Sequence, residues 1–177
     1  MRLMSLIEWR VRQLLNHIRA LPVRTQRRFR KPSSMAADVY LANGHCIVCA
    51  VTPTFDGLSL ALDPDVIPSP VTAELLERAI NQAFGRSRRY VRMPRGKQWD
   101  SSFKPFLHAA DVRSLKSFMA GAKLVSLRQE GGMVEVMPND NLGPKGGFQG
   151  RPDDLVIIPA DEPRKVAQAV MRLLFDQ

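Results

Sequence analysis

The stretch ADVYLANGHCIVCAV, residues 37–51, decides the fold. Two apolar runs, residues 37–42 and 45–51, flank Asn43-Gly44, and an Asn-Gly pair in that position is a strong signal for a tight β-hairpin. A third run, LSLAL at 58–62, predicts another strand. KLVSLRQ and MVEVM, on either side of residues 130–132, predict a second hairpin. The pattern therefore indicates an antiparallel sheet that is built from hairpins.

Helical patterns separate and follow these strands. Ser69-Pro70 is a good helix start, and apolar residues recur at helical spacing as far as Ala83. The same periodicity predicts a last helix over residues 162–174, and short helices are expected over 103–107 and 111–119. The expected fold class is α+β, with helices packed on the sheet. Each half repeats the order of hairpin, acidic turn, apolar-apolar-proline and helix, which indicates either a duplication or two common α+β units.

The N-terminal part has a different character. Residues 1–32 hold nine basic side chains and one acidic side chain, and an apolar stripe over residues 3–21 predicts an amphipathic helix. Pro22 should end this helix, and a basic stretch leads to Met35, which offers an alternative translation start. We therefore divide the chain into a basic arm and linker, residues 1–34, and an α+β domain, residues 35–177.

Charge is segregated in the rest of the chain. Residues 33–85 hold six acidic side chains and one basic, whereas residues 86–97 hold six basic side chains and no acidic one. No apolar run reaches about 18 residues, so no transmembrane segment is expected. Two cysteines make no disulfide framework, which favours a reducing cytoplasm.

His45-Cys46-x-x-Cys49 suggests a metal or redox site, but its place in a strand argues against both. Side chains three apart in a strand point to opposite faces of the sheet, and a structural zinc ion needs four ligands. We expect both cysteines in the core, with no metal and no cofactor. The chain also lacks the usual motifs of a catalytic nucleophile, a metal-dependent hydrolase or a phosphate-binding loop. The sequence predicts a binding protein, not an enzyme.

The basic segments allow a function in nucleic-acid binding. Segment 86–97 contains Tyr90 among its arginines and is followed by Trp99, and arginine with aromatic groups can stack on bases and neutralise phosphates. Together with residues 24–31 it could form the footprint of a nucleic-acid-binding module. A solvated surface, or a surface paired with the acidic residues of 33–85, is the favoured explanation of the same charges. The contact residues of this alternative are Arg86, Arg88, Arg89, Arg92, Arg95 and Lys97.

Three stretches of the second half carry a family resemblance. LKSFMAGAKLVSLRQEGGMVEV (115–136), KGGFQGRPDDLVIIPAD (145–161) and VAQAVMRLL (166–174) resemble the CdiI-type immunity proteins of contact-dependent growth inhibition. The likeness is strongest over residues 103–177 and extends loosely to about residue 38. The resemblance implies a bacterial cytoplasmic antitoxin that binds a cognate CdiA C-terminal toxin domain and blocks its active site or its access to substrate.

Toxins of this kind are often nucleases with cationic clefts, so an acidic immunity surface would attract them electrostatically. The family pattern assigns no contact residues, and the acidic set expected from the sequence is Asp56, Asp63, Asp65, Glu74, Glu77, Asp153 and Asp154. An acidic toxin that docks on the basic segment is the other arrangement compatible with the charges.

Overall fold

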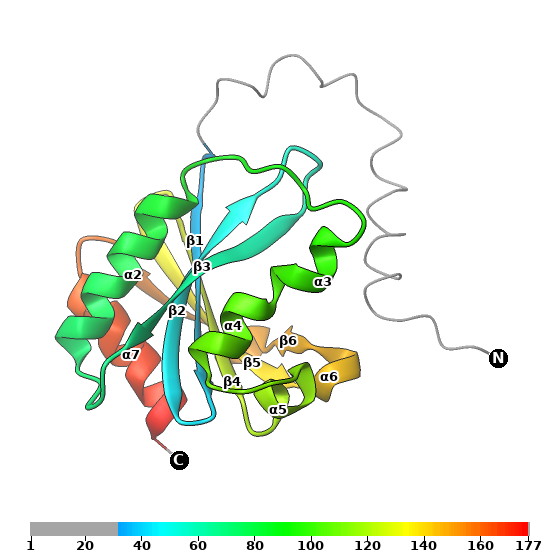
Figure 1. Ribbon diagram of the computed structural model, residues 1–177. Coiled ribbons are helices and arrows are strands. Elements are labelled where there is room, and N and C mark those ends of the chain that lie inside the picture. Colours follow the sequence, from blue (N-terminus) through cyan, green and yellow to red (C-terminus); the bar gives the residue numbers. More distant parts are fainter. Residues whose placement is uncertain (1–31, 177) are drawn as a thin grey trace.

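The structure, a computed structural model, describes residues 32–176 and has the predicted antiparallel sheet at its centre (Figure 1). Six strands lie in the order β3-β2-β1-β4-β5-β6, and β7 also pairs with β5, beside β6. The strands are β1 (Met35–Ala42), β2 (His45–Pro53), β3 (Ser59–Ile67), β4 (Lys123–Glu130), β5 (Met133–Asn141), β6 (Phe148–Gly150) and β7 (Val156–Pro159).

The two predicted hairpins are confirmed. Asn43 and Gly44 have φ angles of 49° and 78°, and Ala42 pairs with His45 across the turn. Positive φ at both central positions is the requirement of a tight type I′ turn, which Asn-Gly satisfies at low cost. Strands β4 and β5 close the second hairpin over Gly131 and Gly132 in the same way.

Strand β3 is longer than expected. The sequence predicts a strand over residues 58–62 followed by a turn, but β3 continues to Ile67. Asp63 takes a positive φ of 53°, and the pairing register of β2 and β3 shifts between Val48 and Ala50. This irregularity bends the strand at its acidic Pro-containing segment instead of ending it, so Val66 and Ile67 still pair with β2.

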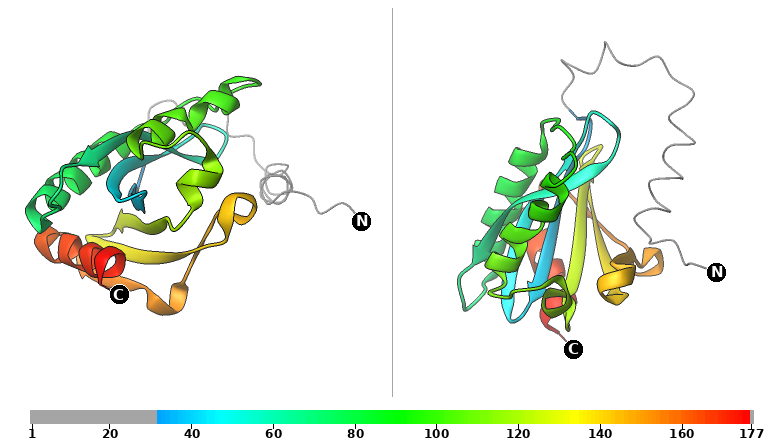
Figure 2. Two further views of the ribbon diagram at one scale, coloured as in Figure 1. Left: turned by 60° about the horizontal axis from the view of Figure 1, so that its bottom comes forward. Right: turned by 45° about the vertical axis from the view of Figure 1, so that its right-hand side comes forward.

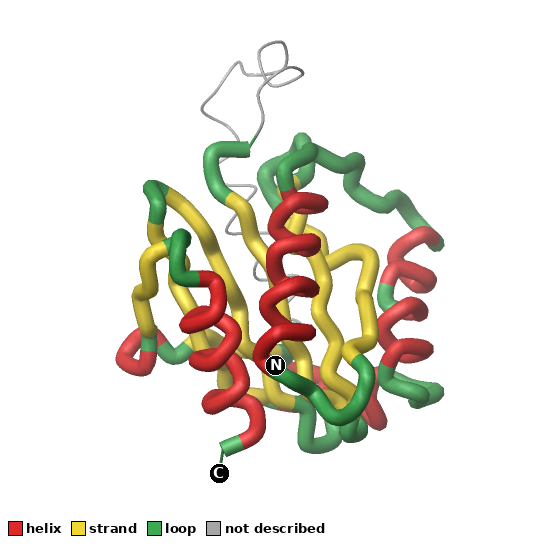
Figure 3. The backbone as a smooth tube through the Cα atoms, turned by 90° about the vertical axis from the view of Figure 1, so that its left-hand side faces the viewer, coloured by secondary structure: helices red, strands yellow, loops and turns green. Residues whose placement is uncertain are grey.

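Helices cover both faces of the sheet, which confirms the α+β fold class. Helices α2 (Ala73–Ser87) and α7 (Pro163–Phe175) lie side by side on one face (Figure 3). Three short helices follow α2 along the chain and lie on the other side of the sheet (Figure 2): α3 (Gln98–Ser102), α4 (Lys104–Ala109) and α5 (Leu115–Met119). Between β5 and β7 the chain adds α6 (Gly143–Gly146) and the 3-10 turn η2 (Pro152–Asp154).

Helix α2 begins later than the sequence predicts. Ser69-Pro70 lies before α2, and Thr72 caps the helix by accepting a hydrogen bond from the Leu75 N–H at 3.3 Å. A threonine side chain in extended backbone satisfies one of the free N–H groups of the first turn, a role that proline cannot perform.

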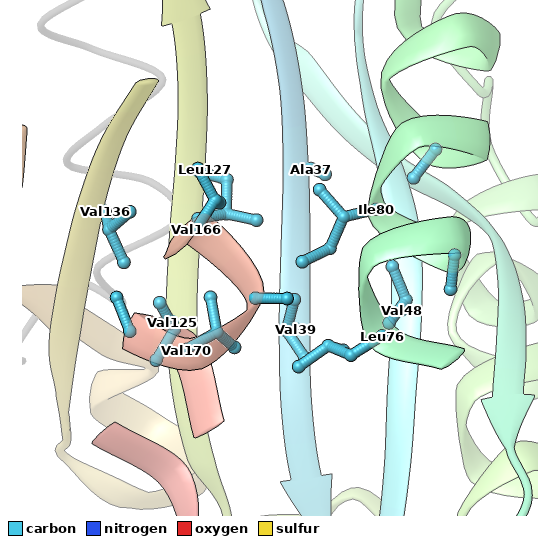
Figure 4. Close-up of a cluster of buried hydrophobic side chains, with 14 of the residues drawn as sticks. Ala37, Val39, Val48, Leu76, Ile80, Val125, Leu127, Val136, Val166 and Val170 are labelled. Atoms are coloured by element: carbon cyan, nitrogen blue, oxygen red, sulfur yellow. The ribbon is translucent and has the colours of Figure 1, made fainter. Parts of the chain in front are cut away.

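The main core lies between the sheet and the helices α2 and α7 (Figure 4). Val39 and Val125 are paired at the centre of β1 and β4 and are almost completely buried. Leu76 and Ile80 of α2 pack against β1 and β2, while Val170 of α7 packs near β4.

A second core lies on the opposite face. The Tyr40 ring of β1 makes edge-to-face contacts with Phe106 of α4, Phe118 of α5 and Phe148 of β6, at centroid distances of 5.9, 5.7 and 5.8 Å. Because Phe106 and Phe118 are buried, this aromatic group holds the short helices against the sheet.

The two halves of the domain have the same order of elements. A hairpin is followed by a strand that pairs with its second member and then by a long helix: β1-β2-β3-α2 in the first half and β4-β5-β7-α7 in the second. Strands β1 and β4 pair with each other from Met35 to Leu41 and join the halves at the middle of the sheet. The structure thus contains the repeated pattern that the sequence indicates, whatever its origin.

The predicted amphipathic helix over residues 3–21 and most of the predicted linker lie outside the described residues. Within residues 32–176, no helix has the length and apolar character that crossing a bilayer requires.

Candidate functional site

The acidic side chains predicted to bind a partner are spread over several elements. Asp56 lies in the β2–β3 turn, Asp63 and Asp65 lie in β3, and Glu74 and Glu77 lie on α2. Asp153 and Asp154 lie in η2, beside β5 and far across the sheet from β3. The structure therefore brings together two groups of acids rather than one patch, a β3–α2 group and an η2 group.

Most of the β3–α2 group is paired with arginines of this chain. Arg86 Nη2 lies 2.5 Å from Asp65 Oδ2, and Arg89 Nη2 lies 3.2 Å from Asp63 Oδ2. Glu74 and Glu77 pair with Arg78 and Arg164 at 3.6 and 3.7 Å. The interpretation that part of the basic segment matches the acids of residues 33–85 is confirmed. Each predicted surface thus neutralises part of the other.

The η2 group differs because apolar side chains lie next to it. Arg151 pairs with Asp154 at 3.0 Å and with Asp140 at 3.8 Å, whereas Asp153 has no ion pair among the described side chains. Directly after η2, Val156 and Ile157 of β7 are 38% and 55% exposed, and Met133 of β5 is 39% exposed. Exposed apolar side chains with an acidic margin are the composition of a protein-contact site.

The remaining bases form what we name the basic rim: Arg88, Arg92, Arg95 and Lys97. All four side chains are exposed, and none has an ion pair among the described side chains. They occupy the segment between α2 and α3, with the 43% exposed Trp99 at its end. Of the six predicted basic contact residues, these four are free to meet an anion.

A polar network on the sheet escaped the sequence analysis. The Tyr40 hydroxyl donates to Asp38 Oδ2 at 3.3 Å, and Asn139 Nδ2 donates to Ser126 Oγ at 3.2 Å. Burial raises the pKa of Asp38 to about 6, and hydrogen bonds from Ser126 and Tyr40 oppose that shift. The sequence does contain a signal for this network, because Asp38 stands within the apolar run of residues 37–42. An acid in such a strand needs hydrogen-bond partners when the strand is buried.

The cysteines behave as predicted for a strand. Cys46 packs in the α2 side core and Cys49 in the core on the other face, so the prediction that they point to opposite faces is confirmed. Burial raises the pKa of Cys46 to about 12 and shifts the pKa of Cys49 in the same direction. Both thiols therefore stay protonated and are poor nucleophiles at neutral pH. Among residues 32–176, no group of three or more His, Cys, Asp and Glu is placed to hold a metal ion.

The architecture and these surfaces define a small α+β protein whose exposed features suit contact with another macromolecule. No protein-family model matches the sequence, and a search of curated proteins found no match.

The solved structures that share the fold include two with known source organisms. One is a protein of unknown function, NMB0488 from Neisseria meningitidis, with a TM-score of 0.67, 14% identity and coverage of 82% of this chain and 96% of that chain. The other is a chain of the CdiA-CT/CdiI toxin and immunity complex from Yersinia pseudotuberculosis, with a TM-score of 0.64 and 14% identity. That match covers 81% of this chain and 97% of the other. At this identity the likeness shows the shared fold.

Proposed function

We propose that this protein is an immunity protein that binds and neutralises the C-terminal toxin domain of a cognate CdiA-type effector. The observation that carries the proposal is the fold shared with nearly the whole of a chain from a toxin and immunity complex. The sequence resemblance over residues 103–177 supports it independently. Its mechanism is occlusion: a rigid surface covers the toxin's working cleft and performs no reaction of its own. The proposed location of the protein is the bacterial cytoplasm, where it would bind the toxin.

We propose the η2 group and the neighbouring apolar side chains as the docking surface. Binding energy in protein interfaces comes mainly from a few buried apolar anchors within a polar margin. Ile157 and Met133 supply the anchors, since the pairing of β5 with β7 puts both exposed side chains on the same face of the sheet. Asp153, four residues before Ile157 in the chain, supplies a carboxylate that has no ion pair among the described side chains. The acids of the β3–α2 group contribute less because arginines of the same chain already neutralise most of them.

The cationic surface expected of a nuclease fits these acids. A charge of opposite sign near the anchors speeds the encounter and fixes the orientation, while the apolar contacts slow dissociation. Tight binding is necessary because one free toxin molecule acts many times. A nanomolar Kd corresponds to about −12 kcal/mol, which an interface of about 1,600 Å² can supply.

Co-expression with the toxin domain of the CdiA-type effector encoded beside this gene tests the proposal. We expect the full-length protein to restore growth of a bacterial host and to co-purify with the toxin domain. Ile157→Arg should abolish protection, since it places a charge in the centre of the apolar surface. Val66→Arg is the matched control, because Val66 is 45% exposed on β3, away from η2.

Three outcomes decide between the parts of the proposal. Failure of the wild-type protein to protect or to bind would overturn the immunity function itself. Protection by wild type that survives Ile157→Arg would leave the function standing and move the docking surface elsewhere. Loss of protection in both variants, with both folded by circular dichroism, would show that the effect is not specific to the η2 surface.

A further inference from the structure

The face of the sheet that carries the short helices is buried at one end only. Tyr40, Ile47 and Leu124 point to this face and are buried in the second core. Because side chains alternate between the two faces of a strand, the pairing register shows which other residues point the same way. Further along β1, β4, β5 and β7 none of these is buried. We name this region the open face, and its main side chains are Asp38, Arg128, Met133, Glu135, Met137 and Ile157.

The open face is both acidic and apolar. Asp38 and Glu135 have no ion pair among the described side chains. Within β1, β4, β5 and β7, Arg128 is the only base that points to this face, and Glu130 of the same strand already pairs with it. Met133 and Ile157 contribute exposed apolar surface. Unpaired carboxylates beside apolar side chains are complementary to a protein surface that is basic and apolar.

Asp38 lies where the open face meets the buried end, and its carboxylate is held in one orientation. The Tyr40 hydroxyl donates to Asp38 Oδ2 at 3.3 Å, and the Ser126 hydroxyl is its second donor. Ser126 in turn accepts from Asn139 Nδ2 at 3.2 Å. A carboxylate accepts about four hydrogen bonds, so these two donors leave acceptor sites free. Since no base of the described chain pairs with Asp38, a cationic donor has to come from a bound partner.

The free protein is destabilised by this acid. Burial raises the pKa of Asp38 to about 6, so the ionised form is unfavourable in the isolated fold. An asparagine of nearly the same shape would accept the same hydrogen bonds without a buried charge. A basic side chain of a bound protein would stabilise the carboxylate, and the attraction strengthens as the partner excludes water. Asp38 is therefore better suited to a complex than to the free protein.

Asp38 and Ile157 are close enough for one partner to cover both. Asp38 pairs with Ser126, which pairs with Met137, and Ile157 pairs with Glu135 two residues along β5. Three strand spacings and two residues place the Cα atoms of Asp38 and Ile157 about 16 Å apart. An interface of about 800 Å² on each partner extends further than that. The surface proposed for docking at β7 thus continues inward across β5 and β4 to β1.

We propose that the open face receives a protruding basic segment of the toxin domain, and that Asp38 pairs with an arginine or lysine of that segment. Met133, Met137 and Ile157 contact apolar side chains beside that base. Glu135 supplies a second negative charge between Asp38 and Ile157. This inference rests on the proposed immunity function and deepens it, because it names the chemistry of the toxin segment and the acid that binds it.

Isothermal titration calorimetry of the full-length protein with the purified toxin domain of the neighbouring effector tests the pairing. Asp38→Asn should weaken binding by at least about tenfold, because it leaves the base of the toxin without its carboxylate. The same variant should be no less stable than wild type in urea at pH 7, so lost affinity cannot be attributed to lost folding. Asp176→Asn is the matched control, since exposed Asp176 follows α7 on the other face of the sheet, and its affinity should be that of wild type.

A second pair of variants tests the open face without changing Asp38. Glu135→Lys should also weaken binding by at least about tenfold, because it repels a basic segment from the middle of the face. Glu74→Lys makes the same change on α2, which covers the other face, and should have little effect. Alanine variants of the toxin's surface arginines and lysines then identify the partner of Asp38: for one of them, Asp38→Asn should cause no further loss of affinity.

The outcomes separate this inference from the immunity function. A wild-type protein that does not bind the toxin overturns both. Wild-type affinity in Asp38→Asn, or the absence of any basic toxin residue coupled to it, overturns the pairing and leaves the immunity function standing. If Asp38→Asn proves less stable, the other pair decides, and equal affinities of Glu135→Lys and Glu74→Lys overturn the open face as the docking site. A dimer of the isolated protein that Glu135→Lys dissociates, with toxin affinity unchanged, assigns the face to a second copy of the chain instead.

Discussion

Asp38 is an acid that the fold keeps largely out of water at the centre of a sheet. Its neighbours across the strands are Cys49 of β2 and Ser126 of β4. Neither of these two neighbours is a basic side chain that could pair with the carboxylate. Desolvation outweighs the hydrogen bonds from Tyr40 and Ser126, and the pKa of the carboxyl rises from 3.8 to about 6. At neutral pH the carboxylate is therefore ionised at a cost to the folded state.

The sign of the pH dependence follows from this shift. Between about pH 4 and pH 6 the folded protein holds the Asp38 proton while the unfolded chain releases it, so this group lowers the free energy of unfolding as pH rises. Two pKa units correspond to at most about 2–3 kcal/mol. Asp38→Asn should remove this loss and be more stabilising at pH 7 than at pH 4.

Urea unfolding of wild type and Asp38→Asn at both pH values measures this effect. The difference between the two proteins isolates Asp38 from the other ionisable groups, because those groups are the same in both proteins. Asp153→Asn is the control that makes the same chemical change at an exposed side chain. An Asp38→Asn effect equal at both pH values would show that Asp38 titrates normally in the folded protein.

At the scale of an element, α5 shows how tertiary contacts support a helix that is too short to be stable alone. It has five residues, and isolated helices of that length do not persist in water. Ser114 caps it by accepting from the Ser117 N–H at 3.1 Å, and Phe118 inserts its buried ring beside Tyr40 and Phe103. Packing of one aromatic side chain therefore fixes the position of α5.

Phe118→Ala should lower the free energy of unfolding by about 3–5 kcal/mol, because it leaves a cavity within an aromatic group. Leu115→Ala is the matched control in the same helix, since Leu115 is 42% exposed, and it should cost less than about 1 kcal/mol. Chemical denaturation followed by circular dichroism measures both. A small effect of Phe118→Ala would mean that α5 is not required for the second core.

Local chemistry explains which elements the sequence could predict. Asn43-Gly44 specifies its turn within two residues, and β1, β2, β4 and β5 correspond to short apolar runs of adjacent positions in the sequence. The extension of β3 depends on a left-handed Asp63 and on pairing partners in β2, which no local pattern shows. The pairs of Arg86 and Arg89 with β3 also needed the fold, since only the sheet brings segments more than twenty residues apart within ion-pair distance.

At the scale of the molecule, the two halves share one continuous sheet. Strand β1 of the first half pairs with β4 of the second over seven residues, and α2 packs against α7. Val39 and Val125 meet at the seam, and side chains of both halves belong to one core cluster. We therefore expect a single cooperative unfolding transition.

The two buried thiols report on opposite faces of the sheet and so test this expectation. In Cys49→Ala only Cys46 remains, on the face of α2, and in Cys46→Ala only Cys49 remains, beneath the short helices. In each variant, reactivity with a thiol reagent should appear at the same denaturant concentration at which circular dichroism is lost. A thiol that reacts at lower denaturant would reveal a face that opens independently.

The start of β1 has a practical consequence for work with this protein. It lies beside Arg88 at one end of the sheet, whereas the end of α7 lies at the other end (Figure 1). An affinity tag or fluorescent label joined directly before residue 32 would lie next to Arg88 and would cover that cationic end of the sheet. A label attached after α7 leaves that end open, so the choice of terminus for a fusion decides which surface an experiment can observe.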